Sequence, residues 1–230
     1  MIPESVTEFI NLHKTTKHQF NPIPTDVEPV SWILSGSNIP WVDMQLDIPA
    51  QEMLEEARSL KSEFVKHRFS DGHGWSSLAI HGISKTHTMS ANAYGFEESL
   101  DLYHYTEIVD QCPVTVNFLK NLPGVRFARV RFMLLEPQGY IIPHKDNWNN
   151  YTASAMNISL NHPDGCLMTV EDFGIIPFSN NGSAFFFNNY YKHSVVNLSN
   201  EDRYHIIIHG DFDFNVWGEK LVACYNAQLQ

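Results

Sequence analysis

The sequence predicts a mainly β protein with flanking helices, in which an antiparallel sandwich or barrel has helices packed on one sheet. Short runs rich in β-branched and aromatic residues follow one another after Gly124. Turn sequences such as Asn161–Gly165 separate these runs, as is typical of antiparallel sheets. Before Gly124 the apolar residues recur at helical spacing instead. Helices followed by a series of strands favour this two-layer arrangement.

Two helical regions are predicted in the first half of the chain. From Ala50 to His67, apolar residues recur at helical spacing with charged residues between them, which indicates an amphipathic helix. A second helical region is expected at 106–121, and Leu122–Gly124 ends it. The predicted strands are Val125–Leu135, Tyr140–Pro143, Ala155–Leu160, Cys166–Val170, Ala184–Phe187, Ser194–Leu198 and Arg203–Gly210.

We expect the 230 residues to form a single domain, because the length suits one large domain and no internal repeat is present. The N-terminal segment, 1–49, is rich in proline and is predicted to be irregular. Residues 50–124 are expected to form a support of helices and strands, and 125–214 the core that carries the site. Residues 215–230 are expected to be a C-terminal tail.

Composition excludes several classes of partner. The 15 Lys and Arg residues against 26 Asp and Glu residues give a formal net charge of -11, which argues against nucleic acid. No apolar run approaches the ~18 residues of a membrane-spanning helix, and no signal peptide is recognisable. The three cysteines form no CxxC pair, so we expect a reducing compartment, the cytoplasm. The pattern indicates no particular oligomeric state.

A His-x-Asp pair on a strand offers two metal ligands to one cavity, because alternate side chains share a face. The sequence contains three such pairs. The pair at His209 has no histidine after it, and the pair at His162 reads as a hairpin turn, where we expect His162 to be exposed. The pair His144 and Asp146 follows a predicted strand and is the best candidate.

A third ligand and an anion-binding residue follow later in the chain. His193 begins another predicted strand, so His144, Asp146 and His193 form a candidate metal triad. Two histidines and one carboxylate leave positions open on Fe(II) for a co-substrate and dioxygen. Arg203 lies among isoleucines and requires an anionic partner, for which a guanidinium fork suits a buried carboxylate. The alternative partner is a local acid, Glu201 or Asp202.

These residues resemble those of the Fe(II)/2-oxoglutarate dioxygenases, in the branch of the aspartyl/asparaginyl β-hydroxylases. The resemblance covers roughly 125–213. The segment RFMLLEPQGYIIPHKD, residues 131–146, is similar to the family's lead into its His-x-Asp pair. The segment FNNYYKHSVVN, residues 187–197, is similar to the stretch around the family's distal histidine. Arg203 falls where the family has its 2-oxoglutarate-binding arginine.

The resemblance implies a double-stranded β-helix, or jelly roll, of the cupin type. It implies Fe(II) held by His144, Asp146 and His193, with 2-oxoglutarate and O2 as co-substrates. It also implies that Arg203 binds the distal carboxylate of 2-oxoglutarate.

The chain departs from the family pattern on the strand after the first ligands. The family has Arg-x-His-Leu, whereas this chain has Ala155–Ile158, and Asn157 is expected to replace the histidine's hydrogen bond to 2-oxoglutarate. His205 shares a strand face with Arg203 by period two, so it is either a residue of the co-substrate pocket or ordinary core packing.

Three further residues are candidates for contact with the substrate. Arg129 and Arg131 share a strand face, and one of them is expected to reach a substrate carboxylate; the alternative is a surface ion pair. Trp75 opens a strand and is expected to form the floor of the substrate pocket, with simple packing as the alternative.

We therefore predict a dioxygenase that hydroxylates an aliphatic carbon of an amino acid or amino-acid-like small molecule, releasing succinate and CO2. A free substrate is favoured over one within a peptide, since the chain shows no peptide-binding repeat. The alternative is a non-catalytic jelly-roll protein that binds a small molecule or a metal. Retention of all three ligands and of the arginine favours the enzyme.

Overall fold

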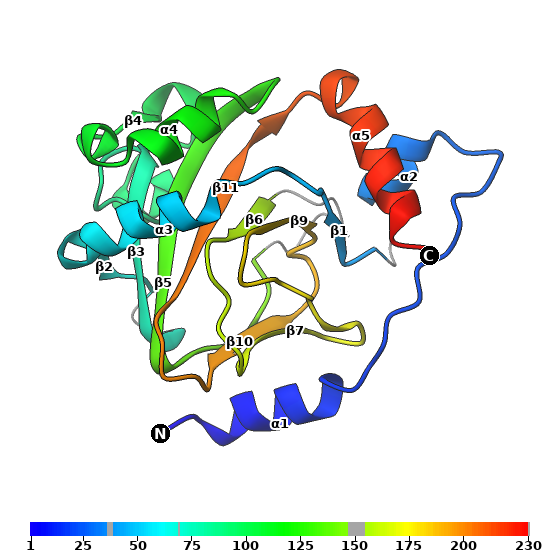
Figure 1. Cartoon of the computed structure of the whole chain (residues 1–230), viewed down its shortest axis with the longest axis horizontal. Helices are drawn as coiled ribbons and strands as arrows, with labels where there is room; N and C mark the ends of the chain where they lie inside the picture. Colours follow the sequence, from blue (N-terminus) through cyan, green and yellow to red (C-terminus); the bar gives the residue numbers. More distant parts are fainter. Residues whose placement is uncertain (36–38, 69, 147–154, 230) are drawn as a thin grey trace.

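A curled antiparallel sheet forms the centre of the molecule, with helices packed around it (Figure 1). The computed structural model describes residues 1–35, 39–68, 70–146 and 155–229. The main path of the sheet runs, in spatial order, through β1 (Trp41–Asp43), β9 (Ser183–Phe187), β6 (Ala155–Ser159), β11 (Arg203–Phe212), β5 (Val125–His144), β10 (His193–Asn197), β7 (Cys166–Val170) and β8 (Gly174–Ile175). β3 (Gly72–Gly82) pairs with β5, β2 (Val65–Lys66) and β4 (His104–Tyr105). The prediction of a mainly β protein is confirmed.

Strand β5 joins the two halves of the sheet. Its first half pairs with β11, in a register that places Leu135 opposite Arg203. Its second half pairs with β10, and the register there places His144 opposite His193. One strand therefore brings residues of both halves to a common interior, where the two predicted metal-ligating histidines become direct neighbours.

The expectation of two separate strands, Val125–Leu135 and Tyr140–Pro143, was wrong, because both belong to β5, which bends at 136–139. Gln138 adopts a φ of 60°, which interrupts the regular strand conformation. A Cβ atom at Gly139 would lie 2.7 Å from the carbonyl oxygen of Glu136, so only glycine fits the bend. β3 pairs with β5 on both sides of the bend, whereas the partner on the other edge changes from β11 to β10.

Side chains alternate between two faces along each long strand. The outer face of β5, β6, β9 and β11 packs against the helices, with residues Val130, Phe132, Leu134, Met156, Ile158, Ala184, Phe186, Tyr204, Ile206 and Ile208. The inner face contributes Met133, Leu135, Phe185 and Phe187 to a second apolar cluster. Arg129 and Arg131 of β5 were predicted to share a strand face, and both line the cavity together with Arg203 of β11. They lie on the inner face because alternate side chains of a strand point to the same side.

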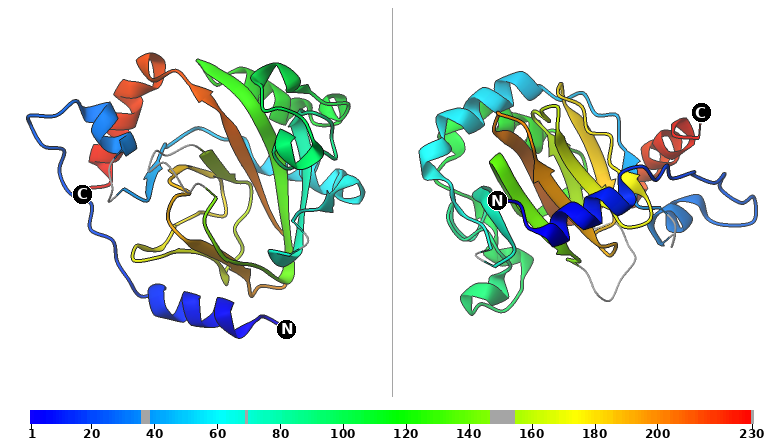
Figure 2. Two further views of the ribbon diagram at one scale, coloured as in Figure 1. Left: turned by 180° about the vertical axis from the view of Figure 1, so that it is seen from behind. Right: turned by 90° about the horizontal axis from the view of Figure 1, so that it is seen from below.

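Helices cover the outer face. α3 (Ala50–Ser59) and α4 (Pro113–Lys120) lie against β3, β5 and β11, and α5 (Phe214–Ala227) packs on α2 (Pro29–Ser35) and β1 (Figure 1). α1 (Glu4–His13) crosses the other side of the sheet near β5, β7 and β10 (Figure 2). Short 3-10 helices occur at Lys61–Glu63, Ala91–Tyr94, Leu100–Leu102 and Val109–Gln111.

Both ends of the chain are more regular than predicted. The segment 1–49 was expected to be irregular, but it contains α1, α2 and β1. The expected tail, 215–230, lies mostly within α5. α1 is short, and it is stabilised by burying Val6 and Ile10 against Val196, a contact that the local pattern does not reveal. Within the described ranges, no helix combines the length and the apolar character needed to cross a membrane.

We expect truncation of side chains on the two faces of β11 to lower the free energy of unfolding by different amounts. Ile206 is fully buried in the outer cluster, whereas Ile207 faces the interior cavity and is only half-buried. We expect Ile206→Ala to lower the free energy of unfolding by about 2–5 kcal/mol and Ile207→Ala to lower it clearly less. Urea denaturation of both variants measures the difference, and equal losses would contradict the assignment of the faces.

Candidate metal and co-substrate site

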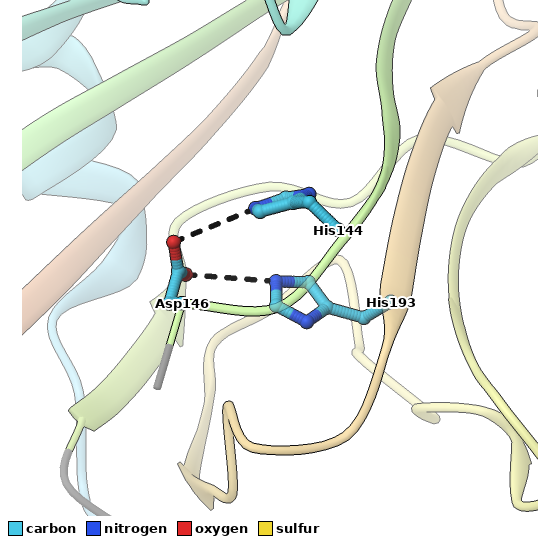
Figure 3. A group of neighbouring side chains, drawn as sticks. All are labelled: His144, Asp146 and His193. Carbon is cyan, nitrogen blue, oxygen red and sulfur yellow. Dashed lines mark ion pairs between the residues drawn. The ribbon is translucent and has the colours of Figure 1, made fainter. Parts of the chain in front are cut away.

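His144 is the last residue of β5 and His193 the first residue of β10, and these two side chains lie together with that of Asp146 (Figure 3). One ligand atom from each residue lies within 4.8 Å of the others. The Nε2 atom of His144 is 3.6 Å from Oδ1 of Asp146, and the Nε2 atom of His193 is 3.7 Å from Oδ2. Both rings point their Nε2 atoms at the carboxylate, which is the convergence that a single metal ion requires.

The other nitrogen of each ring is held by the backbone. His144 Nδ1 lies 2.8 Å from the carbonyl oxygen of Ile142, and His193 Nδ1 lies 2.9 Å from that of Tyr191. A carbonyl oxygen only accepts, so each Nδ1 carries a hydrogen, and Nε2 is the nitrogen of each ring that can bind a metal. Such a partner fixes the tautomer and the orientation of a metal-ligating histidine. Burial, together with His144, lowers the pKa of His193 to about 4, which keeps the ring neutral.

Asp146 is held ionised by its surroundings. Burial raises the pKa of its carboxyl group, but the nearby His193 and Arg68 outweigh that effect and hold the pKa below its ordinary range. Arg68 donates a hydrogen bond of 2.8 Å to Oδ1 and also pairs with Asp71 at 3.8 Å. Two imidazoles and one carboxylate therefore face a common point, and this donor set fits a divalent ion such as Fe(II).

A cavity of about 430 Å³ opens beside this triad. The structure places most of the predicted site residues on its wall: Trp75, Arg129, Arg131, His144, Asp146, Asn157, His193 and Arg203. His205 is the exception, since it is fully buried behind Arg203. A volume in this range suits one or two small molecules.

Arg203 is a buried cation without a buried counter-ion. Its side chain is 3% exposed, and its Nε has no hydrogen-bond partner. Among the described residues it forms no ion pair; Asp202, considered above as a local partner, pairs with Lys61 instead. Burial lowers the pKa of Arg203, yet a guanidinium stays charged in proteins. Such a group is costly to bury unless an anion joins it.

A chain of two histidines supports Arg203 from behind. His162 Nε2 lies 2.9 Å from the carbonyl oxygen of Cys166, and its Nδ1 lies 3.1 Å from Nε2 of His205. The Nδ1 of His205 lies 2.8 Å from a terminal nitrogen of Arg203. The carbonyl requires a hydrogen on His162 Nε2, so the neutral His162 accepts from His205. His205 in turn accepts from Arg203, and the three side chains form one directed series.

Asn157 belongs to the same group. Its Oδ1 atom lies 2.8 Å from Nδ1 of His205, and its NH2 group faces the sulfur of Met168 at 3.8 Å. Asn157 is buried on the cavity wall. Its contact with a co-substrate stays a prediction. Of the two alternatives for His205, the structure shows a buried residue that contacts the cavity through Arg203.

Arg129 and Arg131 are not surface ion pairs. Arg131 is 5% exposed and donates a hydrogen bond of 2.6 Å to the carbonyl oxygen of Thr88. The Nε atoms of both arginines are buried without a partner. Burial lowers the pKa of both arginines, and the nearby Arg129 lowers that of Arg131 further. Both therefore present charge to the cavity.

Trp75 lies on the cavity wall and is 7% exposed. Its ring contacts His67 in an edge arrangement, with centroids 4.4 Å apart. His67 lies on the wall too, where Nδ1 contacts the hydroxyl groups of Ser77 and Thr88. Burial, together with Arg131, lowers the pKa of His67 to about 2. The wall near Trp75 is therefore aromatic, and the guanidinium of Arg68 lies over the Trp75 ring, 5.9 Å from its centroid.

Sequence reasoning missed several residues. His162 was expected to be exposed in a turn, but it is buried and bonded to His205, because the loop after β6 folds inward. His209 lines the cavity although it belongs to a rejected His-x-Asp pair. Arg68 and His67 come from the segment between β2 and β3, and no sequence signal marked them. The period of β11 pointed to His209, which shares a face with Arg203.

Buried neutral histidines make stability depend on pH. In the folded chain the pKa of His67 is about 2 and that of His162 about 3, the latter lowered by burial and then by Arg203. Unfolded histidine titrates near ~6.5, so the unfolded chain binds more protons below that pH. Stability is therefore complete above about pH 6.5 and falls as the pH drops, by roughly 1.4 kcal/mol per pH unit for each histidine.

The variant His162→Gln removes one of these groups and is expected to reduce that slope by roughly 1.4 kcal/mol per pH unit. Urea denaturation between pH 5 and 7 measures it. The exposed His73 provides a matched control, since His73→Gln should leave the slope unchanged. An unchanged slope in His162→Gln would contradict the burial of a neutral ring at this position.

Comparison with known proteins agrees with this geometry. The family model described as aspartyl/asparaginyl β-hydroxylase matches residues 50–211, a longer stretch than the resemblance noted in the sequence. Among curated protein sequences, none matches the chain.

Two solved structures are similar to this chain. A crystal structure of an oxidoreductase of the 2OG-Fe(II) oxygenase family from Burkholderia pseudomallei is similar at a TM-score of 0.50 and 12% identity, covering 86% of this chain and 95% of that one. A prolyl-4-hydroxylase from Pseudomonas putida is similar at 0.44 and 13%, covering 80% and 97%. The first of these likenesses supports the predicted jelly roll.

The family match spans well over half of the chain, and it includes β3, β5, β10 and most of β11, which carry the cavity residues. An enzyme is therefore favoured over the non-catalytic binding protein considered above. The chain belongs to the aspartyl/asparaginyl β-hydroxylase family and is a dioxygenase that depends on Fe(II), 2-oxoglutarate and O2.

Proposed function

We propose that this dioxygenase hydroxylates an aliphatic carbon of an amino acid or amino-acid-like small molecule, free and not within a peptide. The observation that carries the proposal is one cavity that holds both a convergent His-Asp-His group and a buried arginine without a counter-ion. The first suits a metal, and the second suits the carboxylate of an organic acid.

His144, Asp146 and His193 would hold Fe(II). Their orientations are fixed before metal arrives, since backbone carbonyls hold both rings and Arg68 holds the carboxylate. Preorganised ligands bind without paying for reorientation at the moment of binding. Arg68 also orients Asp146 so that one carboxylate oxygen faces each histidine.

Arg203 would bind the distal carboxylate of 2-oxoglutarate. Its Nε is free to donate, and His205 holds one terminal nitrogen, which restricts the guanidinium to one orientation. Asn157 is the adjacent polar group on the wall and would add a hydrogen bond to the same molecule. A buried fork aimed at a planar carboxylate gives both charge and geometric selection.

When bound, Fe(II) with O2 supplies the oxidising chemistry in which 2-oxoglutarate becomes succinate and CO2 while a substrate C–H bond becomes C–OH. The protein's own residues position the two organic molecules and exclude water. Trp75, Arg129 and Arg131 form the part of the wall assigned to the substrate. The neutral ring of His67 packs beside Trp75 and takes no proton near neutral pH.

The size of the cavity supports a small substrate. About 430 Å³ must accommodate the co-substrate as well, which leaves room for a molecule of amino-acid size. The three cysteines are free and buried, which supports the reducing cytoplasm as the location.

Anaerobic titration with Fe(II) and then 2-oxoglutarate tests the proposal. We expect the visible charge-transfer band of the chelate in the wild-type protein and none in His193→Ala, which lacks one ligand. In Arg203→Gln we expect the dissociation constant of 2-oxoglutarate to rise by about 100-fold, because a buried charge-assisted pair is lost.

Arg126→Gln is the matched control for the arginine variant. Arg126 lies on β5, is exposed, and pairs with Asp101 away from the cavity. It should leave the titration unchanged. Absence of the band in folded wild-type protein would contradict the metal assignment. An unchanged affinity of Arg203→Gln for 2-oxoglutarate would contradict the assignment of Arg203 to the co-substrate site.

A further inference from the structure

The cavity is strongly positive inside an acidic protein. Four arginines line it, namely Arg68, Arg129, Arg131 and Arg203, whereas Asp146 is the one acid among the described lining residues. The whole chain has a formal net charge of -11. Buried cations that outnumber the nearby acids destabilise the folded protein, unless the ligands that bind there are anions.

No acid outside the described residues can neutralise this charge. The undescribed positions are 36–38, 69, 147–154 and 230, and by sequence none of them is Asp, Glu, Lys or Arg. Glu98 acts on Arg129 electrostatically, but its carboxylate accepts hydrogen bonds from Tyr103 and from the backbone N–H of Ala91. Glu98 forms no ion pair with Arg129 in the described part of the chain.

Two of the four arginines have assigned counter-charges. Arg68 pairs with Asp71 as well as with Asp146. The charges of Fe(II) and Arg203 are balanced by Asp146 and the two carboxylates of 2-oxoglutarate. With metal and co-substrate in place, Arg129 and Arg131 are therefore the cations that still lack an anion.

The geometry of these two arginines suits one carboxylate. They lie at alternate positions of β5, so both side chains project from the same face. Each Nε is buried without a hydrogen-bond partner. Thr88 holds a terminal nitrogen of Arg131 from behind, which leaves the remaining donors to a ligand. Buried donors that no protein group satisfies are a sign of a ligand that does so.

We propose that the substrate is an acid whose carboxylate binds between Arg129 and Arg131. This inference rests on the proposed function for the identity of the other cavity occupants, and it adds the chemical class of the substrate. A neutral side chain or a peptide amide would leave two buried guanidiniums unpaired. The carboxylate is either the free α-carboxylate of an amino acid or an acidic side chain.

The test compares acids with their amides as binding probes. Isothermal titration of the protein uses the protein amino acids, their C-terminal amides, and N-acetyl-aspartate and N-acetyl-glutamate α-amides, which carry only a side-chain carboxylate. It is run on iron-free protein and on protein loaded anaerobically with Fe(II) and 2-oxoglutarate. We expect at least one acid to bind about 100-fold or more tightly than its amide. The blocked probes distinguish the two sources of the carboxylate.

Variants assign that preference to residues. Arg129→Gln and Arg131→Gln should each weaken the acid by about 10-fold or more, with Arg126→Gln on the same strand unchanged. Arg131→Lys, which keeps the charge, should recover part of the affinity, and thermal unfolding checks that each variant is folded. In the iron-free protein Arg203→Gln should still bind the acid.

Three results would overturn the inference: no acid bound more tightly than its amide, wild-type affinity in both Arg129→Gln and Arg131→Gln, or an acid preference lost only in Arg203→Gln. The chelate band, recorded in the loaded sample, reports on the proposed function separately. If that band is absent while iron-free protein still prefers the acid through Arg129 and Arg131, the function fails and the acid site stands.

Discussion

The burial of arginines without internal counter-ions is the constraint on which the rest of this structure depends. Arg131 and Arg203 are almost completely buried, and neither meets a carboxylate of the described chain. Such charges are normally paired, because their removal from water costs several kcal/mol each. The folded chain therefore holds a space that anions complete, and the chemistry of the cavity follows from which anions enter it.

Opposite faces of the same strands carry the apolar core and the charged cavity. On β11, Ile206 and Ile208 pack into the outer core, while Arg203 and Ile207 face the cavity. Long ladders of backbone hydrogen bonds between β5 and β11 hold both sets in register. Apolar burial on one face thus offsets the unpaired charge on the other, and a side chain that changed face would lose both roles.

Much of the site follows from local sequence periodicity. His144, Asp146 and His193 were recognisable because a His-x-Asp pair and a later histidine supply a metal-ligand set, and Arg129 and Arg131 because alternate residues share a strand face. What the sequence did not reveal depends on tertiary packing. His162 reads as a turn residue until the loop after β6 is seen to fold onto His205, and Arg68 becomes a partner of Asp146 only when β2 and β3 are placed. The helix α1 likewise depends on its contact with Val196.

Which arginine meets which anion is the central question, and a crystal structure grown anaerobically with Fe(II) and 2-oxoglutarate answers it most directly. The account predicts metal bound by His144, Asp146 and His193, and the distal carboxylate of 2-oxoglutarate on Arg203, which keeps its contact with His205. Arg129 and Arg131 should then face the remaining open part of the cavity. A co-substrate carboxylate bound by Arg129 or Arg131, with Arg203 left unpaired, would contradict it.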